Sequence, residues 1–229
     1  MLFAIIALAN KARVHLIDDR GGSYYRLPDG SEQHDAGMTV MGQLASAVFR
    51  DQFAPAFLAI SPNNKIPAIV DDEAEGGPLS VFESGAILIY LADKTGRLLP
   101  ADGAARYQVL QWLIWQVGGV GPMFGQVGWF HRSPGNQIED PRPRERYIEE
   151  ARRLVGVFDR HLAGREWIGD AYSIADIATG TWMRALRDGY GAKADTGIAE
   201  AANILRWLAA WEARPAVQRG LKVAAAPAT

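Results

Sequence analysis

The residues best suited to chemistry in this sequence are Glu83 and Ser84, which stand between two apolar runs. The run before them, Leu79 to Phe82, has the length of a strand, and the run after them, Ala86 to Ala92, contains no helix breaker. We therefore expect both residues at the N-terminus of a helix, where free N–H groups and the positive end of the dipole favour an anion. Ser84 and its N–H could hold a carboxylate while Glu83 holds an ammonium group. The alternative is structural: Ser84 caps the helix and Glu83 is an acid favoured by the dipole.

A second strand is expected shortly before this pair, at Ala68 to Asp71. The polar stretch from Asp71 to Pro78 contains Gly and Pro and would reverse the chain between the two strands, so that the following helix packs on a hairpin. The bond Ile66-Pro67 opens the first strand, and about 5–6% of such bonds in folded proteins are cis. We predict a cis bond here, which would turn the backbone N–H and C=O of Ile66 towards a ligand.

Two of these segments resemble the glutathione transferases: residues 64–71, Asn-Lys-Ile-Pro-Ala-Ile-Val-Asp, and residues 82–94, Phe-Glu-Ser-Gly-Ala-Ile-Leu-Ile-Tyr-Leu-Ala-Asp-Lys. Residues 110–123 resemble the Nu class of that family, the bacterial enzymes known for glutathione-dependent disulfide-bond reduction. The likeness runs from about Asp51 to Lys222 and leaves out the first fifty residues.

The resemblance implies a fold of two domains. Residues 1–98 would form a thioredoxin-like α/β domain that binds glutathione, complete or damaged in its divergent residues 1–50. Residues 99–229 would form an all-α helical bundle, the C-terminal domain of the glutathione transferases. The linker is expected at Arg97 to Gly103, beyond which the sequence pattern becomes entirely helical.

Glutathione is the thiol co-substrate that the resemblance implies, and six residues would bind it. Glu83 would pair with the ammonium group of the γ-glutamyl unit, and Ser84 would bind the adjoining carboxylate. The backbone of Ile66 would clamp the cysteinyl unit. Lys65 is a partner for the glycyl carboxylate or a surface residue, and Gln52 would add a hydrogen bond.

The sixth residue is Arg146, which matches the arginine that reaches the ligand from the helical domain in Nu-class proteins. Its alternative is a place on a solvated face, because Arg142, Arg144 and Arg152 surround it in the sequence. In such an enzyme the thiolate of glutathione is the nucleophile and attacks a disulfide or an electrophilic carbon. The sequence does not decide between disulfide reduction and conjugation, nor does it name the second substrate.

The first fifty residues match the family pattern poorly. Leu2 to Leu8 and Ala12 to Ile17 are expected as strands, Gly21 to Gly37 as irregular structure and Thr39 to Arg50 as a helix. The resemblance calls for a strand–helix–strand unit that opens with a Thr-Pro-Asn-Gly turn facing the glutathione sulfur. The sequence has no such turn, and Leu27-Pro28-Asp29-Gly30 lacks the hydroxyl and is interpreted as an ordinary turn.

The missing turn leaves the catalytic residue unknown and three functions open. A displaced reading frame or a substituted N-terminus would explain the mismatch. Tyr24 and Tyr25 could supply a hydroxyl by their chemistry, but nothing in the sequence fixes their position. The chain is a glutathione-dependent enzyme, a glutathione-binding protein with little or no turnover, or a folded fragment without a ligand.

The helical half begins with Ala104 to Trp115, which carries apolar residues on nearly every face, including Trp112. Such a helix is normally buried both against its own domain and against a partner, so a homodimer is expected. Gly118 to Gly128 is rich in Gly and contains Pro122, so a kink or break is predicted there.

Ser173 and Asp176 form a capping signature, with a serine at the cap and an acid three residues later. Tyr172 and Ile177 could supply the accompanying hydrophobic contact. The resemblance places this box at the start of the core helix of the family. Pro67, Ser173 and Asp176 are therefore predicted to be structural rather than catalytic.

Composition excludes several other classes of protein. Lys and Arg number 24 against 26 Asp and Glu, with no long run of either sign, which argues against a nucleic-acid surface. There are no cysteines, so disulfides, thiolate metal sites and a cysteine nucleophile are excluded. The histidines lack metal-ligand spacing, so no metal is expected. Leu2 to Ala9 is too short to span a bilayer and no positive charge precedes it, which favours the cytoplasm over export and predicts no membrane partner.

Overall fold

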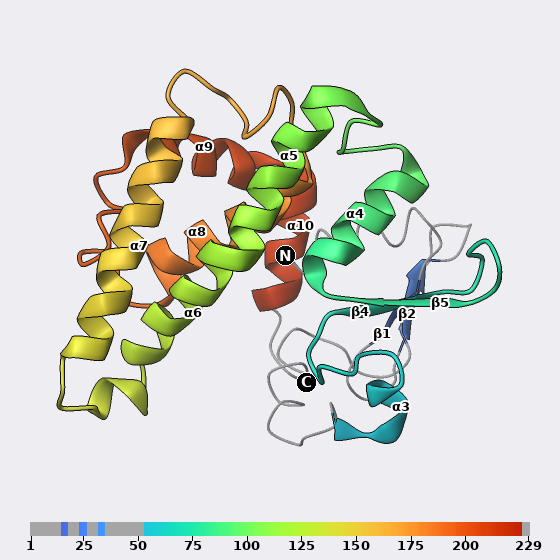
Figure 1. The fold of residues 1–229 in the computed structure, drawn as a ribbon, viewed down its shortest axis with the longest axis horizontal. Coiled ribbons are helices and arrows are strands. Elements are labelled where there is room, and N and C mark those ends of the chain that lie inside the picture. The colour runs from blue at the N-terminus through green and yellow to red at the C-terminus, as the bar shows by residue number, and fades with distance from the viewer. Residues whose placement is uncertain (1–14, 18–22, 27–31, 35–52, 226–229) are drawn as a thin grey trace. The chain divides into compact units, whose positions relative to one another are not determined.

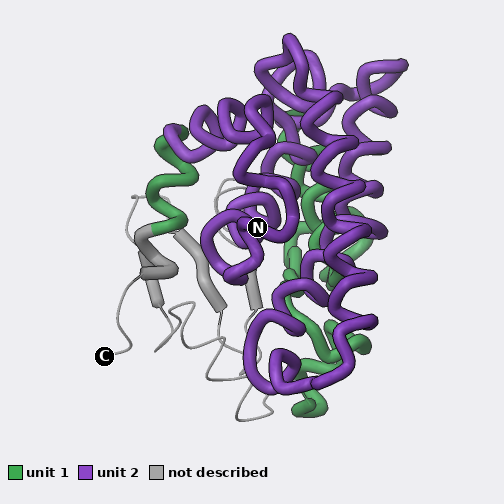
Figure 2. Tube along the Cα trace, turned by 90° about the vertical axis from the view of Figure 1, so that its left-hand side faces the viewer, with its two compact units in different colours: residues 1–97, 214–229 green, residues 98–213 purple. Residues whose placement is uncertain are grey.

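A computed structural model of the 229-residue chain describes residues 15–17, 23–26, 32–34 and 53–225. The chain divides into two compact units, residues 1–97 with 214–229 and residues 98–213 (Figure 2). The division of the sequence into domains at residues 98 and 99 stays a prediction, because a domain is defined by independent folding as well as by compactness.

The first unit contains a five-stranded sheet in the order β3-β2-β1-β4-β5, and every neighbouring pair is antiparallel. The strands are β1 (His15–Ile17), β2 (Ser23–Arg26), β3 (Glu32–His34), β4 (Ala68–Asp71) and β5 (Leu79–Phe82). The hairpin of β4 and β5 lies where the sequence predicted it, with Ala68 opposite Phe82 and Asp71 opposite Leu79 (Figure 1).

The prediction for Gly21 to Gly37 is wrong, because this stretch contains the paired strands β2 and β3. Tyr24 and Tyr25 favour a strand, and this preference outweighs the turn residues around them. β1 lies inside the predicted strand Ala12 to Ile17, whereas Leu2 to Leu8, Thr39 to Arg50 and the turn at 27–30 fall outside the described residues.

The described strands do not form the expected strand–helix–strand unit. A helical crossover joins parallel strands, but β1 runs antiparallel to both β2 and β4. The N-terminal part of the sheet therefore departs from the unit that the family resemblance called for.

Helix α4 (Ser84–Thr95) follows β5 directly and packs against β4 and β5 (Figure 1). Ile87, Leu88 and Leu91 on its inner face are fully buried, as is Ile69 on the hairpin. The helix ends at Gly96, whose φ of 63° is the left-handed conformation that glycine adopts without strain. The other helices of this unit are α3 (Pro55–Leu58) and α10 (Pro215–Ala225).

The described secondary structure of the second unit is entirely helical, with loops between the helices. Its helices are α5 (Gly103–Trp115), η2 (Gln116–Val120), α6 (Gly121–Phe130), η3 (Gly135–Gln137), α7 (Arg142–His161), α8 (Ile174–Arg184), η4 (Ala185–Gly189) and α9 (Ala202–Ala213). The predicted break between Gly118 and Gly128 takes the form of the π-helical segment η2, which joins α5 to α6.

The core of this unit surrounds α8, whose residues from Ile174 to Gly180 are all buried. The amphipathic helix α7 runs beside α6 and buries the apolar face that the sequence predicted, including Leu154 and Phe158 (Figure 1). The ring of Phe158 meets the edge of Trp207 from α9 at a centroid distance of 5.0 Å. Among the described residues, no helix has the length and hydrophobicity needed to cross a bilayer.

The capping box at the start of α8 is confirmed, and Asp176 does more than cap the helix. Its Oδ2 accepts the backbone N–H of Ser173 at 2.9 Å and the Ser173 hydroxyl at 3.0 Å. Its Oδ1 accepts the backbone N–H of Ile168 at 3.0 Å and the indole N–H of Trp207 at 2.9 Å. One buried carboxylate therefore joins α8 to the preceding loop and to α9.

Burial raises the pKa of Asp176 above its ordinary value, although the hydrogen bonds from Trp207, Ile168 and Ser173 act in the opposite direction. None of these donors carries a charge, and together they offset only part of the cost of removing the carboxylate from water.

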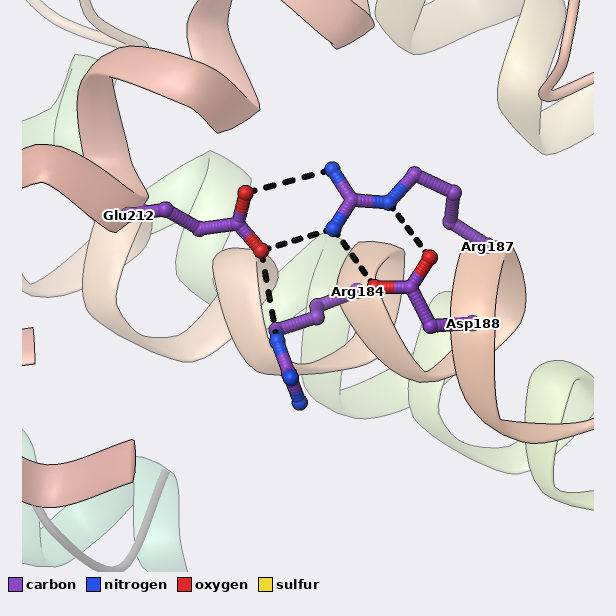
Figure 3. Close-up of polar contacts among 4 residues, drawn as sticks. All are labelled: Arg184, Arg187, Asp188 and Glu212. Carbon is purple, nitrogen blue, oxygen red and sulfur yellow. Dashed lines mark hydrogen bonds and ion pairs between the residues drawn. The ribbon is translucent and has the colours of Figure 1, made fainter. Parts of the chain in front are cut away.

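Charged side chains join η4 to α9 (Figure 3). Both terminal nitrogens of Arg187 donate hydrogen bonds to Glu212, from Nη2 to Oε1 at 2.7 Å and from Nη1 to Oε2 at 3.2 Å. The Nε of Arg187 donates a hydrogen bond to Asp188 at 2.7 Å. Arg184 Nε lies 3.2 Å from the same Oε1 of Glu212. Glu212 therefore forms ion pairs with two arginines at once.

Replacing Asp176 by alanine should destabilise the protein far more than replacing Ser173. Asp176→Ala leaves buried donors on Ile168, Ser173 and Trp207 without an acceptor, and each such group costs about 1–3 kcal/mol. Ser173→Ala removes one cap, for which about 1 kcal/mol is typical. Urea unfolding followed by circular dichroism measures both losses, and equal losses would contradict the bridging role of Asp176.

Candidate functional site

The turn before β4 presents Lys65 and Ile66 at the surface. The bond Ile66-Pro67 is cis, as predicted from the sequence. Ile66 is 36% exposed, whereas Pro67 is buried. The hydroxyl of Ser61, itself fully buried, donates a hydrogen bond to the carbonyl of Lys65 at 2.8 Å and so fixes the turn from inside.

Glu83 and Ser84 open α4, as the sequence predicted. The N-cap position belongs to Glu83, and its side chain makes no capping hydrogen bond. Ser84 is the first residue of the helix, is half-buried, and makes no side-chain hydrogen bond with a described residue. The structural alternative, in which Ser84 caps the helix, is therefore not found, and the first N–H groups of α4 are free of a side-chain cap.

Glu83 has a backbone conformation that L-amino acids rarely adopt, with φ 67° and ψ 119°. A residue in such a conformation typically lowers the stability of the fold by about 1–3 kcal/mol. Residues of this kind cluster at functional sites, which makes Glu83 a candidate for ligand binding. The conformation lets the chain leave β5 and enter α4 without a connecting loop.

The turn and the helix start lie side by side because of the register of the hairpin. Ala68 is opposite Phe82, and continuing this antiparallel register brings Ile66 towards Ser84. A hydrogen bond of 3.4 Å from Asn63 Nδ2 to Glu83 Oε1 also joins the two segments. The site thus combines exposed backbone at Ile66, a carboxylate at Glu83 and a helix N-terminus with a free hydroxyl.

The remaining candidates are placed as follows. Lys65 is exposed next to Ile66, and its side chain makes no hydrogen bond or ion pair with a described residue. Arg146 belongs to the second unit, where it is exposed on α7 and makes no hydrogen bond or ion pair with a described residue. Gln52 lies outside the described residues. No group of His, Asp or Glu in the described part of the chain could hold a metal ion.

Sequence reasoning missed a partly buried polar cluster behind the site, formed by Asp71, Tyr90 and Lys94. Asp71 ends β4 and is fully buried. Its Oδ2 accepts hydrogen bonds from the Tyr90 hydroxyl and the Lys94 ammonium group, and its Oδ1 accepts the N–H of Glu73 at 3.0 Å. An acid that ends an apolar strand, with Tyr and Lys four residues apart on the next helix, was the available signal.

Burial and hydrogen bonds act in opposite directions on the carboxyl group of Asp71. Burial by itself would raise the pKa of Asp71, but the hydrogen bonds from Lys94, Tyr90 and the Glu73 N–H lower it below its ordinary value. Burial and then the hydrogen bond to Asp71 raise the pKa of Tyr90 to about 12. At neutral pH Asp71 is therefore a carboxylate and Tyr90 a neutral phenol.

Comparisons with known proteins agree with the resemblance noted in the sequence. Residues 44–93 match the family described as "Glutathione S-transferase, N-terminal domain". The disulfide-bond oxidoreductase YfcG of Escherichia coli is 54% identical over 58% of this chain and 63% of its own length. The disulfide-bond oxidoreductase YghU of the same organism is 38% identical over 74% of this chain and 59% of its own length. The chain thus spans less than two thirds of these curated relatives.

A crystal structure of a glutathione transferase from Pseudomonas putida, with one glutathione disulfide bound per subunit, is also similar to this chain. The two are 54% identical, the match covers 77% of each chain, and the TM-score is 0.75. These matches confirm the resemblance to the glutathione transferases and to their bacterial disulfide-bond oxidoreductases. They also confirm the predicted fold class, a thioredoxin-like α/β domain followed by an all-α domain.

Replacing Glu83 by glycine should stabilise the protein relative to replacing it by alanine. Both variants lose the carboxylate and the hydrogen bond from Asn63, but only glycine adopts φ 67° without strain. The expected difference is about 1 kcal/mol or more. It is measured as the difference in urea unfolding midpoint between Glu83→Gly and Glu83→Ala, and an alanine variant as stable as the glycine variant would contradict a strained Glu83.

Proposed function

Because this chain belongs to the glutathione transferase family, we propose that it binds glutathione at the N-terminus of α4 and uses the glutathione thiolate to reduce a disulfide or to attack an electrophilic carbon. The observation that carries this proposal is the uncapped start of α4, where the free hydroxyl of Ser84 lies beside the carboxylate of Glu83. The γ-glutamyl end of glutathione carries a carboxylate and an ammonium group on one carbon, and this pair of residues complements both.

Each group at the site has a distinct part in binding. The Ser84 hydroxyl and the first N–H groups of α4 donate hydrogen bonds to the γ-glutamyl carboxylate, and the helix dipole favours its charge. Glu83 accepts hydrogen bonds from the ammonium group. The exposed backbone of Ile66, before the cis bond, pairs with the cysteinyl unit. Lys65 faces the glycyl carboxylate, and Gln52 would add a hydrogen bond, whereas the part expected of Arg146 stays a prediction from the sequence.

The chemistry would be thiol–disulfide exchange. The thiolate of glutathione attacks one sulfur of the substrate disulfide, a mixed disulfide forms, and the other sulfur leaves as a thiolate. A second glutathione then releases the first as glutathione disulfide. The Pseudomonas putida relative, which is described with glutathione disulfide bound, supports this reaction class. With an electrophilic carbon the same thiolate would form a thioether instead.

A second candidate function is glutathione binding with little turnover. The Thr-Pro-Asn-Gly turn that faces the sulfur in Nu-class proteins is missing from the sequence. The described strands β1, β2 and β3 are antiparallel where a strand–helix–strand unit was expected. These observations favour an N-terminal region that does not activate the thiol as the family does.

Two further assignments belong to this proposal. The cytoplasm is the compartment, because a thiol co-substrate works where glutathione is kept reduced. The chain acts as a homodimer, supported by the surface of α5. Tyr107 and Ile114 are 71% and 59% exposed and stand seven residues apart, on one face of the helix. Trp112 instead turns inward, with its ring centroid 6.0 Å from that of Phe158.

Binding and turnover should separate in this protein. By titration calorimetry the wild-type chain should bind glutathione, and Ser84→Ala should weaken binding by about ten- to a hundredfold, since a hydrogen bond to a charged group contributes about 1.5–3 kcal/mol. Asp29→Ala, within the segment that the sequence predicts to be an ordinary turn, is the control and should bind as the wild type does.

Turnover of a model disulfide should be about a hundred- to a thousandfold slower than in the Pseudomonas putida relative assayed alongside, as expected for the loss of one donor to a developing anion. Equal rates would show that the missing turn does not matter. Absence of any glutathione binding would contradict the proposed function itself.

Light scattering tests the homodimer. The wild-type chain at micromolar concentration should have twice the mass of a protomer, through an interface of more than about 1,000 Å² in total. Tyr107→Glu with Ile114→Glu should give a monomer, because charges would be buried without partners. Gln126→Glu, on an exposed position of α6, adds a charge outside α5 and should leave the dimer intact. A wild-type monomer would contradict the assignment.

A further inference from the structure

We propose that Asp71, Tyr90 and Lys94 form a clamp that sets the orientation of α4 and thereby positions Glu83 and Ser84 against the turn at Ile66. The glutathione part of this inference rests on the proposed function. The three residues are positioning residues, since none of them is among the groups proposed to touch the ligand.

The clamp joins β4 to α4, the two elements that carry the site. The joined parts of both elements lie away from the site. β4 begins two residues after Ile66 and ends at Asp71, whereas α4 begins at Ser84 and carries Tyr90 and Lys94 further along. With a rise of 1.5 Å per residue, Tyr90 lies about 9 Å and Lys94 about 15 Å along the helix from Ser84. Both side chains meet one oxygen of Asp71.

Two donors one helical turn apart restrain the helix in a way that apolar packing does not. Ile87, Leu88 and Leu91 hold α4 on the hairpin, but the hydrophobic effect has no direction and permits small rotations and shifts. Hydrogen bonds to a charged group depend strongly on distance and angle. A rotation of α4 that moved Ser84 relative to Ile66 would therefore break the bonds at Tyr90 or Lys94.

Stability alone does not account for a buried charge at this position. Both members of a buried ion pair lose their hydration. Proteins with well-packed apolar residues of similar volume in place of the pair are often as stable or more stable. Asp71 is fully buried, whereas the Lys94 side chain keeps 23% exposure, so this penalty falls mainly on Asp71. What the polar cluster adds over an apolar one is a defined geometry between β4 and α4.

An apolar replacement of the whole clamp separates orientation from stability. In the triple variant Asp71→Leu, Tyr90→Phe and Lys94→Met no charge is left buried without a partner, and the N–H of Glu73 lies in an exposed turn where water can replace Asp71. The unfolding temperature should stay close to that of the wild type. Glutathione binding measured by calorimetry should weaken about ten- to a hundredfold, the range expected when a displaced site loses one hydrogen bond to a charged group of the ligand.

Two matched variants complete the experiment. Lys94→Arg keeps a charged donor and should bind glutathione within a few-fold of the wild type. Ile69→Val removes a methyl group from the buried face of β4 and should lower the unfolding temperature while leaving glutathione affinity unchanged. A triple variant that loses stability but keeps wild-type affinity would show a merely structural cluster and overturn the proposal.

Hydrogen exchange distinguishes failure of the clamp from failure of the proposed function. The N–H of Ile87 donates to the carbonyl of Glu83 at 2.9 Å and reports the first turn of α4 without any ligand. In the triple variant this amide should exchange faster than in the wild type, and an unchanged rate would overturn the clamp. If the wild type binds no glutathione, the proposed function fails along with the ligand part of this inference, whereas faster exchange still upholds the positioning of α4.

Discussion

The antiparallel register of β4 and β5 is the constraint on which the candidate site depends. With Ala68 opposite Phe82, the strand start after Ile66 and the helix start at Ser84 meet at one end of the hairpin. The strained backbone of Glu83 allows the chain to pass from strand to helix without a loop, so the helix N-terminus stays next to the turn. A shift of one residue would separate the two segments and turn every hairpin side chain to the opposite face.

Each unit contains a fully buried aspartate that joins several segments, and the two differ in what surrounds the carboxylate. Asp71 meets the ammonium group of Lys94, and its pKa falls below the ordinary value. Asp176 meets only neutral donors, so burial prevails and its pKa rises. The stabilising contribution of Asp71 is present above its unfolded pKa and is lost as the pH falls through the folded value. Asp176 has the opposite pH dependence. Its stabilising contribution is present at low pH and is lost as the pH rises through its raised folded pKa.

Local patterns in the sequence predicted the hairpin, the start of α4, the cis bond at Ile66-Pro67 and the capping box at Ser173, because each depends on neighbouring residues. Contacts between distant segments were not predictable in this way. The bonds from Asp176 to Trp207 and from Asp71 to Lys94 join residues far apart in the sequence. The strands β2 and β3 were missed because turn residues flank both, β3 is entirely polar, and pairing between the two strands decided the outcome.

We propose that residues 61–84 recognise the peptide part of glutathione without a group that engages its sulfur. Parallel calorimetric titrations with glutathione and S-methylglutathione test this claim most directly, since the two ligands share every carboxylate, amide and ammonium group and differ only at sulfur. Both ligands should bind, with affinities that agree within a few-fold. Tight binding of glutathione together with loss of S-methylglutathione binding would contradict the claim and reveal a thiol-binding group elsewhere in the chain.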